Sequence, residues 1–375
     1  MINICIVHFQ PIEKYPPTVN LIRQVEQSAM PENVILISTA LLTSPKKTDE
    51  KKKIKKYCFG YVTDSMSRIS RLWAYFTFNW NVLRLLLKYR PTRILYFETL
   101  SSGSPWVYKL LFNKRVKIFI HYHEYVSPGE YKKGMLLNKW LHKLESRNYQ
   151  NANWISQTNA ERRELFLQDE KNCNPASVHL LPNYPPANWP ILAKAVVVKK
   201  EVRIGFVYVG ALDLENMYCR EAAYFIANQP DLYFWDIYSN NFSKGVKEFF
   251  NKLNSPNICF KGSLPYEELP LVLPKYQVGL ILYKGHIPNY IFNIPNKLYE
   301  YHVCGLDVWF PKQMKSALSM ITHQTYPKIE PVNFEGLNKA GPAILSRSGF
   351  RYDKQLFSAE TVLATLITRL FEEKK

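Results

Sequence analysis

The stretch Asn293–Phe310, NIPNKLYEYHVCGLDVWF, has the order of features expected of one short helix between a polar loop and an apolar segment. Pro295 stands near its start and Gly305 just beyond its end, the usual positions of these residues around a helix. The free N–H groups and the positive dipole end at a helix start attract phosphate, and a lysine there adds charge. The stretch therefore predicts a helix over Lys297–Val303 whose start binds phosphate.

Three side chains at the start of this helix indicate a larger ligand: Asn296, Lys297 and Glu300. A carboxylate one turn into the helix can accept hydrogen bonds from paired hydroxyls, as a ribose presents them. Such a helix can hold a nucleotide by its phosphate and by its sugar. The alternative is that Lys297 and Glu300 form an exposed ion pair on an ordinary surface helix, and the spacing alone leaves both open.

The size and composition of the chain indicate a globular protein with two domains. Its 375 residues are enough for two separate cores, and 47% of them are hydrophobic against 21% charged. No apolar run reaches the roughly 18 residues of a membrane-spanning helix, and the first residues read as a strand and not as a signal peptide. The six cysteines form no CxxC pair, which fits a reducing cytoplasm without a zinc or disulfide framework.

Positive charge is concentrated in the first half of the chain. Residues 1–200 contain 30 lysines and arginines against 14 acidic residues, whereas residues 201–375 contain 19 against 17. This asymmetry predicts an anionic partner, such as a membrane surface or an acidic acceptor. The run Lys46–Lys56, with seven lysines, is either a solvated loop or a docking site for anionic lipid headgroups. RNA- and DNA-binding motifs are missing, so we expect no nucleic-acid partner.

Apolar runs alternate with helical patterns along both halves of the chain, which predicts an α/β protein. The four prolines of Pro182–Pro190 indicate a break. We therefore predict an N-terminal domain over 1–185, a linker over 186–201, a C-terminal domain over 202–356 and a closing helix over 357–375. No GxGxxG turn follows the first strand, which disfavours a dinucleotide-dependent dehydrogenase.

A long helical pattern covers Ser67–Tyr89. Its apolar residues on one side are Leu72, Tyr75, Phe76, Trp80, Leu83 and Leu87. The pattern predicts either a helix that packs this side against the core of the first domain or an amphipathic helix that lies in a membrane interface.

Ligand-binding residues of open α/β sheets lie at the carboxyl ends of the strands. In the first half, the run IFIHYHEY over 118–125 ends with His121 and His123 on one face, which are either core residues or ligand-binding groups. Two histidines without a third ligand make a weak metal motif, so we expect no metal site. Gly210 follows the first strand of the second half, where a glycine lets backbone N–H groups approach a phosphate. Further candidate binding residues at predicted strand ends of this half are Ala211, Ser239, Asn240, Lys261, Gly262, Ser263 and Lys284.

The string NKLYEYHVCGLDV resembles the NKLxEYxxCGxPV signature of retaining glycosyltransferases with the GT-B fold, of the family 4 type. The fragments HEY at 123–125, SQTNAERRELF at 156–166 and NICFKGSLPYEELPLVL at 257–273 resemble other parts of these enzymes. The resemblance implies two Rossmann-like, doubly wound domains that face each other across a cleft. It also implies a closing helix that can pack on the first domain.

The resemblance implies a function as well: transfer of a sugar, without metal or cofactor, from a UDP- or GDP-type nucleotide sugar. The acceptor would be a glycan or a lipid-linked glycan of surface polysaccharide synthesis, in the cytoplasm at the inner face of the membrane. On this resemblance Glu300 binds the ribose, and Asn296 and Lys297 face the diphosphate. His123 contacts the donor sugar, and Glu124 and Tyr125 contact the acceptor.

The chain departs from the family pattern at two positions. Many members have a second glutamate eight residues before the first, where it meets the donor sugar, and this chain has Phe292 there. The usual proline before the closing strand is Asp307. The first departure favours an alternative in which the protein binds or scaffolds without catalysing transfer.

Overall fold

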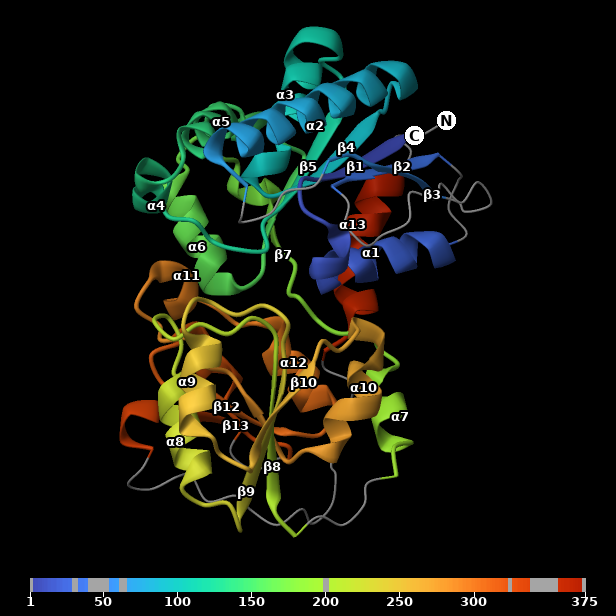
Figure 1. Ribbon diagram of the computed structural model, residues 1–375. Coiled ribbons are helices and arrows are strands. Elements are labelled where there is room, and N and C mark those ends of the chain that lie inside the picture. The colour runs from blue at the N-terminus through green and yellow to red at the C-terminus, as the bar shows by residue number, and fades with distance from the viewer. Residues whose placement is uncertain are drawn as a thin grey trace. The chain divides into compact units, whose positions relative to one another are not determined.

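The computed structural model describes residues 3–28, 33–39, 54–60, 66–197, 202–322, 326–337 and 357–372. The chain forms two compact units, each built around a parallel sheet with helices on both faces (Figure 1). The first unit comprises Met1–Asn183 together with Ala359–Lys375, and the second comprises Tyr184–Ser358. The predicted α/β fold class is confirmed.

The sheet of the first unit has seven strands in the order β3-β2-β1-β4-β5-β6-β7, and all neighbouring strands are parallel. Its strands are β1 (Ile4–His8), β2 (Val34–Ser38), β3 (Ile54–Cys58), β4 (Arg93–Phe97), β5 (Lys117–His121), β6 (Trp154–Gln157) and β7 (Val178–Leu180). The helices of this unit are α1 (Pro16–Gln27), α2 (Arg68–Tyr89), α3 (Gly103–Val107), α4 (Pro128–Lys133), α5 (Leu136–Ser146), α6 (Ala160–Asp169) and α13 (Ala359–Phe371).

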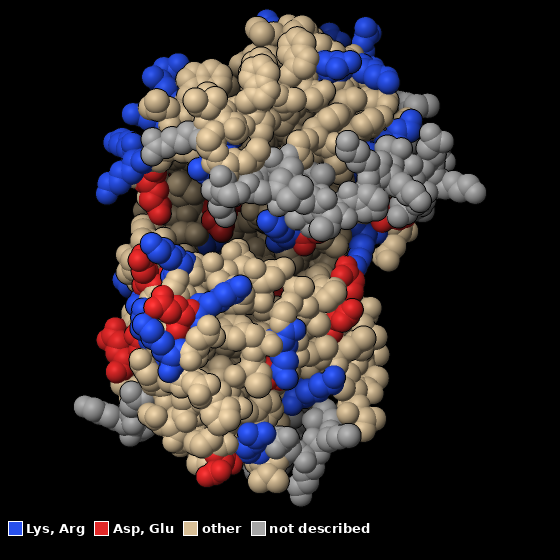
Figure 2. Space-filling view, in the orientation of Figure 1, with Lys and Arg blue, Asp and Glu red and all other residues tan. Residues whose placement is uncertain are grey.

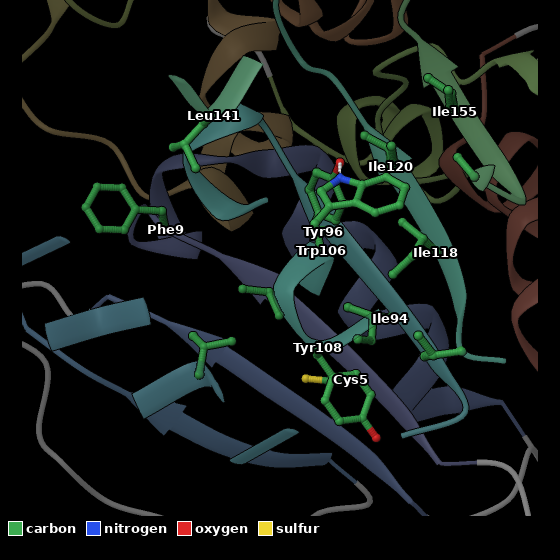
Figure 3. Packing of buried hydrophobic residues seen from close by; sticks show 14 of the residues in the cluster. Cys5, Phe9, Ile94, Tyr96, Trp106, Tyr108, Ile118, Ile120, Leu141 and Ile155 are labelled. Carbon is green, nitrogen blue, oxygen red and sulfur yellow. Dashed lines mark hydrogen bonds between the residues drawn. The ribbon is translucent and has the colours of Figure 1, made fainter. Parts of the chain in front are cut away.

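Two hydrophobic cores lie on the two faces of this sheet, because alternate residues of a strand point to opposite sides. Val7 belongs to the core under α2, α3, α5 and α6, and Ile6 belongs to the core under α1 and α13. Figure 3 shows the first of these cores, where the Trp106 indole N–H donates a 2.9 Å hydrogen bond to the Tyr96 hydroxyl. The closing helix α13 therefore packs on the sheet of the first unit.

The buried side of helix α2 overlaps only in part with the side that the sequence pattern predicts. Tyr75, Phe78, Val82 and Leu86 face the core, and Leu83 packs against it. Of the predicted side, Tyr75 and Leu83 are confirmed, whereas Leu72, Phe76, Trp80 and Leu87 are exposed. The helix has apolar residues on two adjacent sides, so the 3.6-residue period fits either side equally well. Because only one side of α2 packs against the sheet, its second apolar side is exposed.

The last residues of the basic run Lys46–Lys56, predicted as a loop, belong to a strand. Residues 46–53 lie outside the described residues, but Ile54, Lys55 and Lys56 begin strand β3 at the edge of the sheet. Lysines are common on edge strands, where they discourage pairing with other chains. Here Lys56 also forms a 3.1 Å ion pair with Glu26 of α1.

The sheet of the second unit has six parallel strands in the order β10-β9-β8-β11-β12-β13. These are β8 (Ile204–Val209), β9 (Tyr233–Tyr238), β10 (Ile258–Gly262), β11 (Val278–Leu280), β12 (Asp307–Pro311) and β13 (Ile329–Val332). The helices are α7 (Trp189–Lys194), α8 (Cys219–Ala227), α9 (Val246–Leu253), α10 (Leu269–Val272), α11 (Pro288–Ile291) and α12 (Asn296–Val303). Helices α8 and α9 cover one face, and α7, α10 and α12 cover the other.

The segment 186–201, predicted as a linker, contains helix α7. Trp189 is 2% exposed and packs with Ala193 in the core of the second unit. The sequence pattern misleads here because Pro190 stands in the first turn of the helix, where a proline has no intrahelical N–H bond to lose. Residues 198–201 lie outside the described residues.

Helix α12 is the predicted helix at Lys297–Val303, and it packs very closely on the sheet. The Tyr301 hydroxyl accepts a 3.0 Å hydrogen bond from the N–H of Val209 in β8. The Tyr301 ring lies against Gly279 of β11, where a Cβ atom would come within 2.3 Å of ring carbons. A glycine at this position therefore allows α12 to approach the ends of the strands. Of the described helices, none is both long and apolar enough to span a membrane.

We expect Gly279→Ala to reduce the free energy of unfolding by about 2 kcal/mol, because the added methyl group must displace a fully packed tyrosine ring. The measurement is urea denaturation, with Gly129→Ala as the control because a Cβ there meets nothing closer than 3.9 Å. Equal stability of the two variants would contradict this account of how α12 is seated.

Candidate functional site

Lys297, in the first turn of α12, lies directly over the end of strand β8. A Cβ atom on Gly210 would be 2.9 Å from Cε and 3.0 Å from Nζ of Lys297, so a side chain at this position would displace the end of the lysine from the place it has here. The φ of Gly210 is +129°, which also favours glycine. The structure thus brings together two residues that the sequence suggested separately for a diphosphate.

Two tyrosines surround the Lys297 ammonium. Its Nζ is 5.8 Å from the centroid of the Tyr208 ring and 6.0 Å from that of Tyr283, distances at which a cation is attracted to an aromatic face. The Tyr208 hydroxyl donates a 2.7 Å hydrogen bond to the carbonyl of Ala211, which holds the loop after β8 in place. The sequence did not reveal these tyrosines, because they lie within or directly after apolar strands and read as core residues.

The start of α12 has free hydrogen-bond donors. Its N-cap residue is Pro295, whose side chain cannot cap the helix. Within the described part of the chain, the N–H groups of Asn296 and Lys297 make no hydrogen bond, and neither does the N–H of Ala211. Unpaired N–H groups at a helix start, beside an ammonium, favour the binding of an anion such as a phosphate.

Glu300 is buried one turn further along α12, with 5% of its surface exposed. Burial raises the pKa of its carboxyl from 4.5 to about 7, while the Lys297 ammonium and a hydrogen bond from the Asn296 side chain act in the opposite direction. The alternative of an exposed surface ion pair is therefore wrong. A buried carboxyl beside a helix start can accept hydrogen bonds from hydroxyl groups with little competition from water.

The other predicted residues of the second unit are spread along the same end of its sheet. Ser239 and Asn240 follow β9, the neighbour of β8, and the Ser239 hydroxyl donates a 3.0 Å hydrogen bond to the carbonyl of Asn241. Lys261, Gly262 and Ser263 lie at the end of edge strand β10, two strands or roughly 10 Å from β8. Each position is within the span of a nucleotide whose phosphate lies at Gly210.

Lys261 and Lys284 contact residues other than Gly210, Lys297 and Glu300. Lys261 Nζ lies 3.5 Å from the Asp236 carboxylate. Lys284 Nζ lies 5.7 Å from the ring centroid of Tyr218, the N-cap residue of α8, whereas the side chain before it, Tyr283, contacts Lys297. The structure therefore groups Gly210, Lys297 and Glu300 more closely than it groups Lys261 or Lys284 with them.

In the first unit, His123 lies in a cluster of rings at the carboxyl end of the sheet. Its ring stacks at 5.2 Å on Phe97 and at 5.2 Å on Tyr15, and its Nε2 forms a 3.2 Å hydrogen bond with the Thr18 hydroxyl. Its Nδ1 is buried without a hydrogen-bond partner in the described residues. Nε2 of His8 and Nε2 of His121 in the same cluster also lack a partner among the described residues, so three buried ring nitrogens are left that could bind a ligand hydroxyl.

The histidines of this cluster are uncharged. Burial holds the pKa of His123 well below its usual 6.5, and the nearby His121 and His8 act in the same direction. Burial also lowers the pKa of His121 to about 3 and that of His8 to about 4. Neutral imidazoles suit contacts with hydroxyls more than charge stabilisation. Among the described residues, no group of three or more potential ligands is arranged to hold a metal ion.

Glu98, which the sequence pattern did not reveal, positions the backbone at His123. Its carboxylate accepts hydrogen bonds from the N–H groups of His123 (2.6 Å) and Glu124 (3.3 Å). Its own φ is +61°, a strained value for a residue with a side chain and one that is concentrated at functional sites. Burial, reinforced by Glu124, raises the pKa of Glu98 to about 8. The signal in the sequence was an acidic residue directly after a buried strand.

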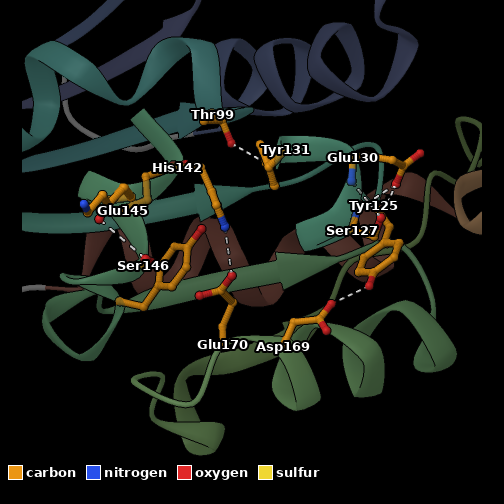
Figure 4. A network of polar contacts seen from close by, with 12 residues as sticks. Thr99, Tyr125, Ser127, Glu130, Tyr131, His142, Glu145, Ser146, Asp169 and Glu170 are labelled. Carbon is orange, nitrogen blue, oxygen red and sulfur yellow. Dashed lines mark hydrogen bonds and ion pairs between the residues drawn. The ribbon is translucent and has the colours of Figure 1, made fainter. Parts of the chain in front are cut away.

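The two residues predicted to contact the acceptor have different surroundings. The Glu124 side chain is exposed, while Tyr125 is buried and its hydroxyl donates to the carboxylate of Asp169 in α6 (Figure 4). Tyr125 lines a small cavity of about 20 Å³, room for about one water molecule, together with His142 and Glu170, which pair at 3.2 Å. Their role in acceptor binding stays a prediction.

The fold of the chain is shared by solved structures, although the chain matches no protein-family model and no curated protein sequence. Sucrose-phosphate synthase from Thermosynechococcus elongatus has a TM-score of 0.63 at 14% identity, over 90% of this chain and 88% of that one. HepE from Anabaena, solved with UDP-glucose, has a TM-score of 0.62 at 12% identity, over 90% and 88%. A UDP-GlcNAc 2-epimerase from Methanocaldococcus jannaschii has a TM-score of 0.57 at 12% identity, over 98% and 99%.

These likenesses establish the fold. The two parallel sheets with their helices correspond to the two Rossmann-like units of GT-B proteins, as the sequence predicted. The identities are too low to transfer residue roles. The same fold moreover serves a synthase in one of these proteins and an epimerase in another, so function has to be argued from the site.

The raised pKa of Glu300 predicts a pH dependence of stability. Because the folded state keeps a proton that the unfolded state has released, Glu300 lowers the free energy of unfolding as the pH rises from 4.5 to about 7. We expect Glu300→Gln to remove this loss. Above pH 7, the free energy of unfolding of the variant should therefore exceed that of the natural protein by up to about 3 kcal/mol.

Thermal or urea denaturation of both proteins across this pH range measures the difference. Glu98 and Glu145, whose pKa values burial also raises, are present in both proteins and cancel. A difference in stability that does not change with pH would contradict the buried state of Glu300.

Proposed function

We propose that this protein is a glycosyltransferase that takes its sugar from a nucleotide-diphosphate sugar, which the second unit holds. One observation carries the proposal: the Lys297 ammonium, the unpaired N–H groups at the start of α12 and Gly210 meet at one point, next to the buried Glu300. The diphosphate would lie on the first three groups, and the ribose hydroxyls would donate hydrogen bonds to Glu300.

The chemistry of such a site follows from its charges. When the sugar leaves the donor, negative charge develops on the diphosphate, and preorganised donors stabilise that charge best where water is excluded. Lys297 and the helix-start N–H groups are placed for this task. They suit transfer without a metal ion, and the resemblance to retaining enzymes suggests that the sugar keeps its anomeric configuration. HepE, with the same fold, was solved with UDP-glucose, which supports a UDP-type donor.

The first unit would bind the acceptor, a glycan or a lipid-linked glycan. Its excess of positive charge suits an acceptor that carries phosphate or carboxylate groups. His123 would contact a hydroxyl of the donor sugar through Nδ1, in a position that Glu98 fixes. We propose that the protein works in the cytoplasm, at the inner face of the membrane, in the synthesis of a surface polysaccharide.

A second candidate is a GT-B-like subunit that binds a nucleotide sugar without transferring the sugar. Phe292 supports it, because this half-buried residue at the end of α11 cannot make the polar contact that a glutamate makes with a donor sugar. An epimerase would use the same donor site, as the fold of the Methanocaldococcus protein allows. Product analysis separates the three candidates. A glycosyltransferase forms a new glycoside, a binding subunit leaves the donor unchanged, and an epimerase inverts a centre of the donor's sugar.

We expect one of UDP-, GDP- or ADP-sugars to stabilise the protein against thermal unfolding, by about 2.7 kcal/mol at a hundredfold excess over Kd. Lys297→Met should weaken this binding at least about tenfold, because it removes a charge-assisted contact with the diphosphate. Lys275→Met, which removes an exposed lysine of the same unit, is the matched control and should bind normally.

No stabilisation by any of these donors would contradict the proposed function. Equal binding by the Lys297 and Lys275 variants would place the diphosphate elsewhere.

A further inference from the structure

The first unit exposes a large group of apolar side chains on one layer of helices. Twelve of the 21 exposed large hydrophobic residues in the described chain lie on three segments: α2, Tyr108–Phe112, and α5 with its N-cap residue. The aromatic face, as we call this surface, is centred on Trp73, Phe76, Trp80, Leu111, Phe112 and Trp140. Monomeric proteins rarely expose apolar patches of this kind without a partner.

The three segments belong to one layer. Gly103, at the start of α3, would place a Cβ atom 3.0 Å from the Tyr75 hydroxyl of α2 and 3.3 Å from the Leu141 side chain of α5. Helix α3 therefore packs against both α2 and α5, and it continues directly into Tyr108–Phe112. Residues far apart in the sequence are thus brought onto neighbouring helices.

The aromatic face is also rich in exposed tryptophan. The chain has eight tryptophans, of which Trp73, Trp80 and Trp140 are 69%, 56% and 59% exposed, while the other five are buried. All three exposed tryptophans therefore lie on the aromatic face. Tryptophan prefers the boundary between water and lipid, because its ring is apolar and its N–H can bond to headgroups or water.

The charges at this face have one sign. Neither α2 nor Tyr108–Phe112 contains an acidic residue, and the one in α5, Glu145, is fully buried. Exposed basic side chains on or next to these segments are Arg84, Lys88, Lys114, Arg115, Lys139 and Lys143. In Figure 2 the surface over α2 and α5, in the upper part of the view, is largely uncharged, and lysines and arginines gather at its edges.

We propose that the aromatic face binds the surface of an anionic lipid bilayer. The tryptophans would enter the headgroup region, and the surrounding lysines and arginines would contact lipid phosphates. A second copy of this chain fits less well, because it would bring the same positive charges into the contact, whereas an anionic bilayer supplies the opposite charge. This inference is independent of the proposed glycosyltransferase activity.

The test is co-sedimentation of the full chain with vesicles of phosphatidylcholine, with and without phosphatidylglycerol. We expect binding to the anionic vesicles, weakened by salt, and little binding to the neutral ones. Trp73→Ser/Trp80→Ser should reduce the affinity at least about tenfold. Leu232→Ser/Leu271→Ser, which removes two exposed apolar residues from the second unit, should leave the affinity unchanged.

A second pair of variants tests the charge. Lys139→Gln/Lys143→Gln on α5 should weaken binding by roughly tenfold, and Lys244→Gln/Lys247→Gln in the second unit should have little effect. The emission of the exposed tryptophans should shift to shorter wavelength with anionic vesicles. The shift should shrink in Trp73→Ser/Trp80→Ser.

Two results would overturn the proposal. One is equal vesicle binding by all four variants and the natural protein, or no binding at all. The other is a dimer in sedimentation velocity that Trp73→Ser/Trp80→Ser dissociates, which would assign the face to a second copy of the chain.

Discussion

The contact of Lys297 with Gly210 depends on how closely α12 approaches the sheet of the second unit. Tyr301, one turn later in the helix, fits against Gly279 and accepts a hydrogen bond from the backbone of β8. Two glycines therefore allow α12 to lie in this position. Gly279, in β11, lies beneath the tyrosine ring, and Gly210, after the neighbouring strand β8, lies beneath the lysine. Because the helix lies this close, its unpaired N–H groups, its ammonium and its buried carboxyl all lie at the carboxyl end of β8. A larger residue at Gly279 would push the Tyr301 ring and α12 away from the sheet, whereas one at Gly210 would displace the end of the Lys297 side chain.

The first unit also has a buried carboxyl beside a strand end, but there it contacts the backbone. Glu98 leaves strand β4 with a strained backbone and accepts hydrogen bonds from two N–H groups after β5, which fixes the position of His123. Both units thus place a buried carboxyl with a raised pKa beside a strand end. In the first unit this carboxyl holds the backbone of a neutral histidine, whereas in the second we propose that it binds the hydroxyls of a ligand.

The sequence predicted the fold class because apolar runs alternate with helical patterns along both halves of the chain. It predicted the helix at Lys297 because a proline before and a glycine after a short pattern are typical of a helix. It could not show that Lys297 reaches Gly210, since they come from distant parts of the chain. Tyr208 and Tyr283 were missed because a tyrosine at the end of an apolar run reads as part of the core. Glu98 was missed although an acidic residue directly after a buried strand was visible, since its contacts with the backbone after β5 come from a distant part of the chain. On helix α2 the sequence placed Tyr75 and Leu83 correctly but also assigned exposed residues such as Trp80 to the core. Both apolar sides of this helix have helical spacing, and only the contact with the sheet decides between them.

The most direct test of this account is a crystal structure of the full chain with UDP, GDP or ADP bound. The account predicts a diphosphate within hydrogen-bond distance of Lys297 Nζ and of the N–H groups at the start of α12, with the ribose hydroxyls on the Glu300 carboxyl. A nucleotide bound elsewhere, or one whose diphosphate lies away from α12 and Gly210, would contradict it.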